Sequence, residues 1–423
     1  MFTKYAKKAG KKLANTFVTR ENVQAVKKVT GPSASVRSIC FHAVAKNEMT
    51  RDTVMPDIEY VVYYGEKNAV SHYNMWNPVF AERPGTYASI FRFSASWWPV
   101  NEDPNIFAVS SINQIEPLFR RMPNLKAVFY PANNGVNMQA IRNTDLTHVF
   151  LGHGDSNKAS SANKCFRLYD EVWVAGQAHR DRFDRVSGDY SSLKFPIVGQ
   201  PWMRGWYKSL PKYDAEDRNQ WGYFPTWRGY YSNTNYSSLD ITKGIAAVAQ
   251  ESLGETAAGF LKLHPWSKPA DVKAVSKVVE AHTPPQPTET IDENGEAVPV
   301  PEVGLFLPDQ AIQLRDILKK PLRFVVCDIS AAVTECLFIN VPIFLYYPQP
   351  PALVADDFEE QNAFCYLYRN VDELKALLKR VIVDGDDYLA EERAQAMNYR
   401  VDLEKTADGQ FYKELDRLPK ING

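Results

Sequence analysis

Residues 147–158 read Thr-His-Val-Phe-Leu-Gly-His-Gly-Asp-Ser-Asn-Lys, a short apolar run that passes into a loop with two glycines. The apolar run predicts the end of a buried strand, so His153 is expected on a loop at the carboxyl end of that strand. Open α/β sheets bind their ligands at this end. Because an unperturbed imidazole has a pKa of about 6.5, His153 is a candidate general base at neutral pH. The alternative is a histidine in a structural turn.

Apolar runs of strand length recur along the chain and are separated by helical stretches. One series comprises residues 36–44, 60–64, 89–93, 125–130, 148–151, 171–175 and 195–198, and a second comprises 220–225, 259–263, 303–307, 323–326 and 342–346. This alternation predicts mostly parallel sheets with covering helices. The 423 residues exceed the roughly 250–300 at which a single core stops growing, so we expect an α/β chain with two doubly wound, Rossmann-like domains.

Composition shifts predict the boundaries. Residues 200–218 are punctuated by glycine and proline and fit neither helix nor strand, so the hinge is placed there. We expect a basic helix in 1–30, Rossmann-like domains in 31–205 and 206–390, and a helical segment in 391–423. Residues 283–302 are rich in proline and acids and contain an Asn-Gly signal, which predicts an exposed hairpin or mobile loop.

The first twenty residues are strongly basic. They carry five lysines and one arginine and no acid. On a helix, their apolar side chains fall on one side and most lysines on the other. One interpretation is a helix on an anionic membrane surface, where each basic residue contributes on the order of 1 kcal/mol. The other is a first helix packed on the protein. We favour the membrane surface.

Several classes of protein do not fit the sequence. The five cysteines lack the spacing of a disulfide framework or a zinc site, which indicates a reducing compartment. No apolar run of about 18 residues and no secretory core occurs. We therefore expect a cytoplasmic protein, peripheral on the inner face of the plasma membrane, with no nucleic-acid partner.

Three further segments place chemistry-bearing residues where strands end. Residues 261–265 end a strand in His264-Pro265, with Lys262 two residues before the histidine. Residues 225–228 end another strand in Arg228, which can clamp a diphosphate or simply lie solvated. In 324–335 a buried strand turns into a helix at Ser330, which is a candidate phosphate site or an ordinary N-cap. Asp328 is open to the same two interpretations.

These elements, in this order, resemble the CDP-glycerol glycerophosphotransferases, the teichoic acid and capsule polymerase-like enzymes of the GT-B superfamily. The similar motifs are His-Gly-Thr/Ser-x-x-Lys at 153–158, Tyr-Asp-x-hydrophobic at 169–172, Gly-x-Pro at 199–201, Pro-Thr-aromatic-Arg at 225–228, Lys-x-His-Pro at 262–265 and Asp-x-Ser-Ser at 328–331. The resemblance implies two domains that face each other across a cleft, with the acceptor on the N-terminal side and the donor nucleotide on the C-terminal side.

The resemblance also implies a reaction, the transfer of an alditol phosphate from a CDP-activated donor to a hydroxyl of a glycan or lipid-linked acceptor. His153 then removes the acceptor proton, while His264 and Arg228 neutralise phosphate charge. Ser330 and the following helix hold the donor phosphate, and Glu335 holds the ribose. No cofactor and no metal are expected. The remaining donor or phosphate candidates are Ser156, Lys158, Lys262, Asp328 and Ala331.

Two positions depart from the family pattern. Asp155 stands where the family has Thr or Ser, and Ala331 replaces the second Ser of Asp-x-Ser-Ser. One lost neutral hydrogen bond costs only about 1 kcal/mol, so Ala331 does not exclude activity. Two alternatives therefore stay open. The first is a glycosyltransferase that uses a CMP- or other nucleotide-activated sugar, with Asp155 or His153 as base. The second is an inactive membrane-associated scaffold of a capsule-assembly complex.

Overall fold

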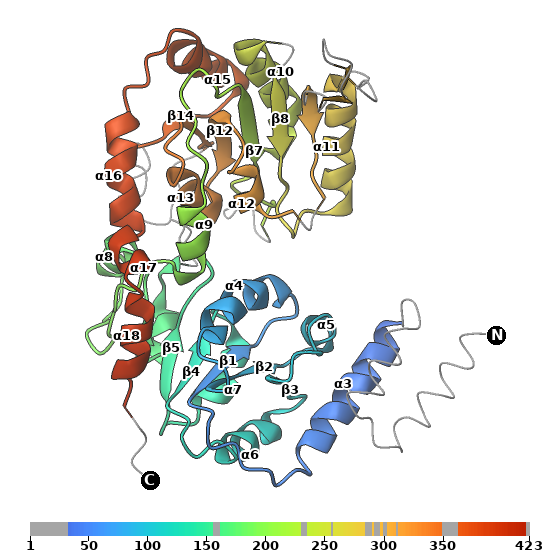
Figure 1. Ribbon diagram of the computed structural model, residues 1–423, viewed down its shortest axis with the longest axis vertical. Coiled ribbons are helices and arrows are strands. Elements are labelled where there is room, and N and C mark those ends of the chain that lie inside the picture. Colours follow the sequence, from blue (N-terminus) through green and yellow to red (C-terminus); the bar gives the residue numbers. More distant parts are fainter. Residues whose placement is uncertain are drawn as a thin grey trace, which may run out of the picture.

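A computed structural model of the chain describes residues 33–154, 161–229, 235–254, 257–283, 303–309, 312–348 and 363–419, together with the backbone of 290–291 and 297–298. These residues form two α/β domains, each built on a six-stranded sheet, with the C-terminal domain above the N-terminal one in the view of Figure 1.

The N-terminal sheet is parallel throughout. Its strands are β1 (Tyr60–Tyr64), β2 (Tyr87–Phe91), β3 (Ile106–Ala108), β4 (Ala127–Tyr130), β5 (Thr147–Phe150) and β6 (Glu171–Val172), in the spatial order β3-β2-β1-β4-β5-β6. Along β1, Tyr60, Val62 and Tyr64 join one buried cluster, while Val61 and Tyr63 join the other. Because both faces are covered, the strand reads as continuously apolar.

The C-terminal sheet repeats this arrangement. It comprises β7 (Gln220–Phe224), β8 (Ala258–Leu261), β11 (Gly304–Phe306), β12 (Leu322–Asp328), β13 (Ile343–Tyr346) and β14 (Tyr366–Tyr368), in the order β11-β8-β7-β12-β13-β14 and parallel throughout. Numbered within its own domain, each sheet runs 3-2-1-4-5-6, which is the Rossmann order. The prediction of two Rossmann-like, doubly wound domains is confirmed.

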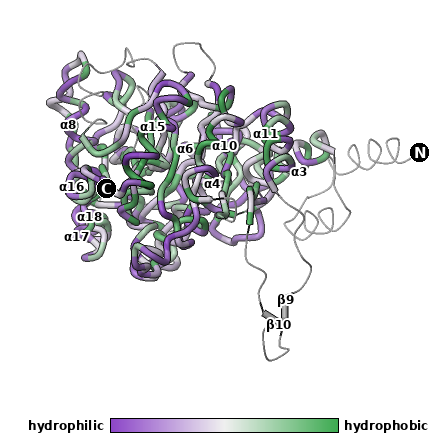
Figure 2. Tube along the Cα trace, turned by 90° about the horizontal axis from the view of Figure 1, so that it is seen from above, coloured by the Kyte–Doolittle hydropathy of each residue, from purple (hydrophilic) through white to green (hydrophobic). Residues whose placement is uncertain are grey.

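Helices cover both sheets. In the N-terminal half they are α3 (Ala34–Glu48), α4 (Val70–Ala81), α5 (Ser94–Trp97), α6 (Ile115–Arg120), α7 (Met138–Ile141) and α8 (Gln177–Arg185). In the C-terminal half they are α9 (Arg204–Lys208), α10 (Thr242–Leu253), α11 (Pro269–His282), α12 (Leu314–Ile317), α13 (Ala331–Leu337), α15 (Val371–Leu378), α16 (Ala390–Arg400), α17 (Leu403–Ala407) and α18 (Gln410–Arg417). Figure 2 shows both hydrophilic and hydrophobic stretches along the helices that it labels.

Some predicted elements differ from the structure. The strand predicted at 36–44 is wrong, since α3 spans this segment and buries Cys40, Phe41, Val44 and Ala45 at helical spacing. Residues 195–198 form no named strand and make one isolated bridge, between Ile197 and Val174. The predicted hinge, 200–218, contains α9, so the prediction that it forms no helix is wrong there. The hairpin predicted within 283–302 is confirmed by the antiparallel pair β9 (Thr290–Ile291) and β10 (Ala297–Val298).

The C-terminal helices return to the N-terminal domain. In Figure 1, α16 descends along one side of the molecule from the upper domain, and α18 lies against the lower one. Phe411 and Leu415 of α18 are buried in the core of that lower domain. The hydroxyl of Thr406 in α17 accepts a 3.0 Å hydrogen bond from the backbone N–H of Gln200. The chain end thus fastens the two domains together.

Gly199 packs closely against these C-terminal helices. Its φ is +71°, and a Cβ built there overlaps the Thr406 hydroxyl. We therefore expect Gly199→Ala to destabilise the protein by about 2–4 kcal/mol, through backbone strain and the lost packing. Gly205→Ala is the matched control, because a Cβ at Gly205 meets nothing within 4 Å. Thermal unfolding followed by circular dichroism checks this, and equal melting temperatures for the two variants would contradict it.

Candidate active site

The topology defines where a ligand is expected. In each sheet the order of the strands reverses between the first and fourth strands, and ligands bind beyond the carboxyl ends of the strands at such points. These points lie between β1 and β4 in one domain and between β7 and β12 in the other. A pocket of about 490 Å³ joins them, since Asn68 after β1 and Trp227 after β7 both line it.

The two domains also meet directly, beyond the carboxyl ends of β5 and β12. A Cβ built on Gly154, beside His153, would lie 3.0 Å from the Cβ of Ala331, at the start of α13. The loop after β5 therefore contacts the helix that follows β12, across the domain boundary. The predicted cleft between the two domains is confirmed by this contact and by the shared pocket.

His153 is exposed and has a fixed orientation. Its Nδ1 lies 2.8 Å from the carbonyl oxygen of Pro131, at the end of β4. A carbonyl can only accept, so Nδ1 is the donor, and the neutral ring carries its lone pair on Nε2. The indole N–H of Trp76 supports the same loop by donating to the carbonyl of Gly152 at 2.8 Å. The neutral ring in this orientation has the tautomer of a general base.

A second imidazole, not found by the sequence reasoning, packs on His153. The ring of His72 in α4 stacks on it with centroids 4.0 Å apart and an interplanar angle of 25°. His72 Nδ1 lies 2.7 Å from a carboxylate oxygen of Glu66, whose other oxygen accepts from Asn134 at 3.4 Å. Glu66 lies just past the carboxyl end of the strand predicted at 60–64. This position at a strand end was the sequence signal that could have identified Glu66 as a site residue.

His264 has the opposite tautomer. Its Nδ1 accepts a 3.1 Å hydrogen bond from the backbone N–H of Trp266. A backbone N–H can only donate, so the neutral ring of His264 carries its proton on Nε2. The imidazole is half-buried beside Trp227, at a centroid distance of 6.3 Å. One domain thus supplies a proton-accepting imidazole and the other a proton-donating imidazole.

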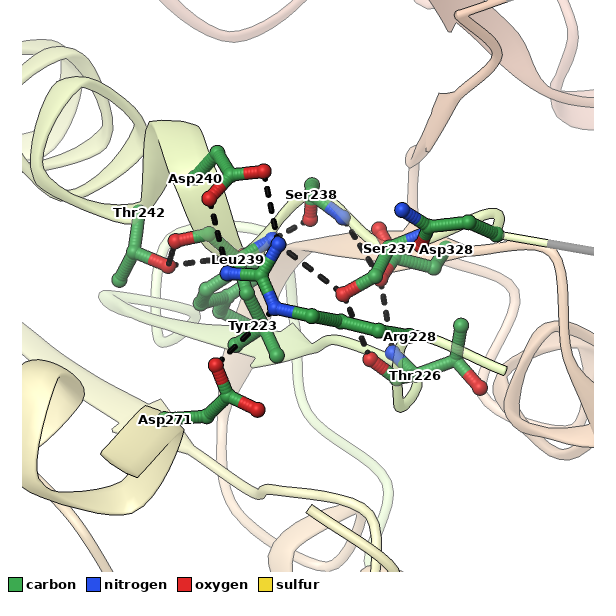
Figure 3. Close-up of polar contacts among 11 residues, drawn as sticks. Tyr223, Thr226, Arg228, Ser237, Ser238, Leu239, Asp240, Thr242, Asp271 and Asp328 are labelled. Carbon is green, nitrogen blue, oxygen red and sulfur yellow. Dashed lines mark hydrogen bonds and ion pairs between the residues drawn. The ribbon is translucent and has the colours of Figure 1, made fainter. Parts of the chain in front are cut away.

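Two of the cations expected at the donor phosphates, Arg228 and Lys262, already have partners within the protein. Arg228 makes a bidentate pair with Asp240, with both distances 2.8 Å, and its Nε bonds Asp271 at 3.0 Å, as Figure 3 shows. Hydrogen bonding to Arg228 lowers the pKa of Asp240. Lys262 is half-buried, and its Nζ donates to the carbonyl of Asp309 at 3.3 Å. Burial lowers the pKa of this ammonium group, so Lys262 loses its proton more readily than a solvated lysine does.

The structure corrects the interpretation of Asp328. This carboxylate is completely buried at the end of β12, where one oxygen accepts from the N–H groups of Thr226 and Ser238 at 2.7 and 3.1 Å. It therefore orders the two loops in Figure 3, and the capping interpretation of Asp328 is wrong. The helix cap is Ser330, whose hydroxyl accepts from the N–H of Ala332 at 3.3 Å.

Glu335 lies in α13, five residues beyond the cap. Burial raises the pKa of its carboxyl to about 7, and the charge of Arg315 offsets this only in part. A carboxyl with this pKa changes its charge within the physiological range.

Comparisons with known proteins bear on the fold. No protein-family profile and no curated protein matches it. Among solved structures it is similar to the S. aureus MnaA–UDP co-structure at 12% identity and a TM-score of 0.53, over 86% of this chain and 100% of that one. The chain has the GT-B fold. Anabaena HepE in complex with UDP, another similar structure, has 12% identity and a TM-score of 0.52, with coverages of 85% and 100%.

A third similar structure of this GT-B fold is a variant of the wall teichoic acid polymerase TagF soaked with CDPG. It has 12% identity and a TM-score of 0.51, and the match covers 94% of this chain and 98% of that one. At such identities the likeness concerns the fold.

The GT-B cleft brings His153, Ala331 and Ser330 to one boundary, while His264 and Lys262 lie at the end of β8, which β7 separates from β12. Asp155, Ser156, Lys158 and the basic segment 1–20 lie outside the described residues. Within the described ranges, no group of three or more His, Cys, Asp or Glu is arranged to hold a metal ion. Over the same ranges, no helix has the length and apolarity needed to cross a membrane.

Proposed function

We propose that the protein transfers a glycerol-phosphate-like group from a CDP-activated donor to a hydroxyl of a cell-surface glycan or lipid-linked acceptor. The observation that carries the proposal is the pair of opposite tautomers, a proton-accepting His153 in one domain and a proton-donating His264 in the other. The similarity to a structure of TagF soaked with CDPG supports the choice of donor.

In the proposed reaction, Nε2 of His153 takes the proton of the acceptor hydroxyl. The acceptor oxygen forms a bond to the phosphorus that carries the glycerol. The bond from that phosphorus to the bridging oxygen breaks, and CMP leaves with the electron pair. The Nε2–H of His264, together with Lys262, stabilises the negative charge that develops on the phosphate oxygens, and such charge stabilisation and positioning are most of what phosphoryl transfer requires.

The remaining predicted residues take supporting places in this proposal. Ser330 and Ala331 lie where the donor phosphate meets α13, and Asp155, Ser156 and Lys158 stay predictions for the acceptor side and the phosphates. Because two carboxylates already match the charge of Arg228, we assign it a positioning role for the Trp227 loop. Glu66 and His72 position the ring of His153.

A donor panel tests the function. CDP-alditols and CMP-sugars are incubated with the protein and an acceptor extract, and CMP release is measured with and without EDTA. We expect release from a CDP-alditol that is unchanged by EDTA. Release from CMP-sugars alone favours the glycosyltransferase, which attacks an anomeric carbon. No donor binding at all favours the scaffold bound to a membrane through residues 1–20. The cytoplasmic, peripheral location of the protein stays a prediction.

Glu335 predicts how donor binding depends on pH. Below about pH 7 its carboxyl is neutral, and above it the carboxylate repels an anionic donor. The dissociation constant of CDP-glycerol is therefore expected to rise by up to about tenfold between pH 6 and pH 8, the limit for one coupled proton. In Glu335→Gln the rise disappears, because the amide does not titrate. Calorimetry at several pH values checks this, and an equal rise in both proteins would refute the assignment.

A further inference from the structure

The cleft contains a pocket that the proposed reaction does not use. The indole pocket, as we name it, has a volume of about 490 Å³ and is lined by Asn68, Trp227, Gly229, Pro265, Trp266, Ser267, Lys268 and Pro269. Its volume lies within the range of about 300–1,000 Å³ that is typical of small-molecule sites. It draws its walls from both domains, because Asn68 follows β1 and the other residues follow β7 and β8.

Two tryptophans give the pocket its apolar surface. The side chain of Trp266 is 43% exposed, which is unusual for so large an apolar ring. The ring of Trp227 lies 5.2 Å away, centroid to centroid, and is tilted by 58°. The two indoles therefore form an angled wall instead of stacking on each other. Such amphipathic rings are common where a ligand is apolar on one side and polar on the other.

The polar lining of the pocket points to a hydroxylated ligand. The hydroxyl oxygen of Ser267 is buried and makes no hydrogen bond to any residue that the structure describes. An unsatisfied buried hydroxyl costs about 1–3 kcal/mol, so a ligand that bonds it recovers this energy. Asn68 offers an amide with two donors and an acceptor, and Lys268 offers an exposed ammonium group.

The indole pocket also adjoins both imidazoles of the proposed centre. The N–H of Trp266 bonds His264, so the pocket wall and the proton donor share one turn. Asn68 lies two residues beyond Glu66, which holds the ring that stacks on His153. The pocket is thus linked to His153 through Glu66 and His72. Arg228 does not attract a further anion, because two carboxylates, Asp240 and Asp271, already pair with its guanidinium group.

We propose that the indole pocket binds a sugar ring of the acceptor, with the apolar face of the ring on Trp266 and Trp227 and its hydroxyls on Asn68, Ser267 and Lys268. This assignment rests on the proposed function, and it makes the acceptor a glycan and not a bare polyol phosphate. The nucleotide of the donor then binds elsewhere in the cleft.

Direct binding of maltose, cellobiose and chitobiose, measured by saturation-transfer NMR, tests the assignment without any catalysis. We expect at least one disaccharide to bind the wild type, Trp266→Ala to weaken that binding at least tenfold, and Trp266→Phe, which keeps a flat ring, to weaken it less than threefold. Ser267→Ala is expected to weaken it several-fold. The control is Tyr388→Ala, another exposed ring, at 45%, which is expected to bind like the wild type.

Calorimetry with CDP-glycerol on the same variants separates the sugar site from the donor site. Unchanged donor affinity in Trp266→Ala supports the assignment. Loss of CDP-glycerol binding in Trp266→Ala overturns it, because the indoles then hold the nucleobase. Equal disaccharide binding by Trp266→Ala and wild type, or no disaccharide binding by a wild type that folds normally, overturns it too. Failure of the proposed transfer reaction is seen separately, as absence of CMP release from every donor.

Discussion

His153→Ala is expected to lower the rate of CMP release in the presence of acceptor by about 10²–10⁴-fold, the contribution of a positioned general base. The reason is geometric, since the carbonyl of Pro131 fixes the tautomer in which Nε2 accepts a proton. The affinity for CDP-glycerol is expected to change less than about twofold, because the base touches the acceptor and not the donor. Steady-state kinetics and donor calorimetry on the same preparation check both expectations.

His72→Phe is the matched control for this variant. It keeps a flat ring against His153 and removes the hydrogen bond to Glu66. A positioning role predicts a loss of less than about tenfold in kcat, because the carbonyl of Pro131 still orients the base. If His153→Ala forms product at the wild-type rate, both catalytic hypotheses lose His153 as their base. If His72→Phe is as slow as His153→Ala, proton removal belongs to the pair and not to His153 alone.

Most of the fold was predictable from local patterns. The strands at 60–64, 125–130, 148–151, 220–225 and 342–346 are mostly apolar runs, because sheets covered on both faces bury most side chains. The strand predicted at 36–44 failed because an apolar run of this length fits a buried helix as well as a strand. The spacing of Cys40, Phe41, Val44 and Ala45 is helical. β3 and β14 were not among the predicted strands.

The site was predictable where a residue follows a strand, and not where its role depends on partners distant in sequence. His153 and His264 were identified because both lie at strand ends. The tautomers could not be predicted, since they depend on the carbonyl of Pro131 and on the N–H of Trp266. The capping interpretation of Asp328 failed for the same reason, because its partners Thr226 and Ser238 lie about a hundred residues away in the sequence.

His264→Ala is expected to lower kcat by about 10²–10³-fold, the typical loss for one hydrogen-bond donor to a developing negative charge. In His264→Gln the side-chain amide can still present an N–H near the position of Nε2, so a loss of only about tenfold is expected. A smaller loss of kcat in His264→Gln than in His264→Ala indicates a hydrogen-bond donor and not a base. An amide nitrogen has no proton-accepting lone pair, so it could not replace a base at this position.

The pH profile of kcat/KM adds a second readout for His264. If His153 is the base, its titration sets the acidic limb, and the limb is expected to stay in place in His264→Gln and to vanish in His153→Ala. His282→Ala is the matched control, since this histidine lies at the end of α11 and bonds the carbonyl of Val278 in its own helix. An acidic limb that disappears in His264→Gln but persists in His153→Ala would exchange the two roles, and the acceptor would then have to approach from the C-terminal domain.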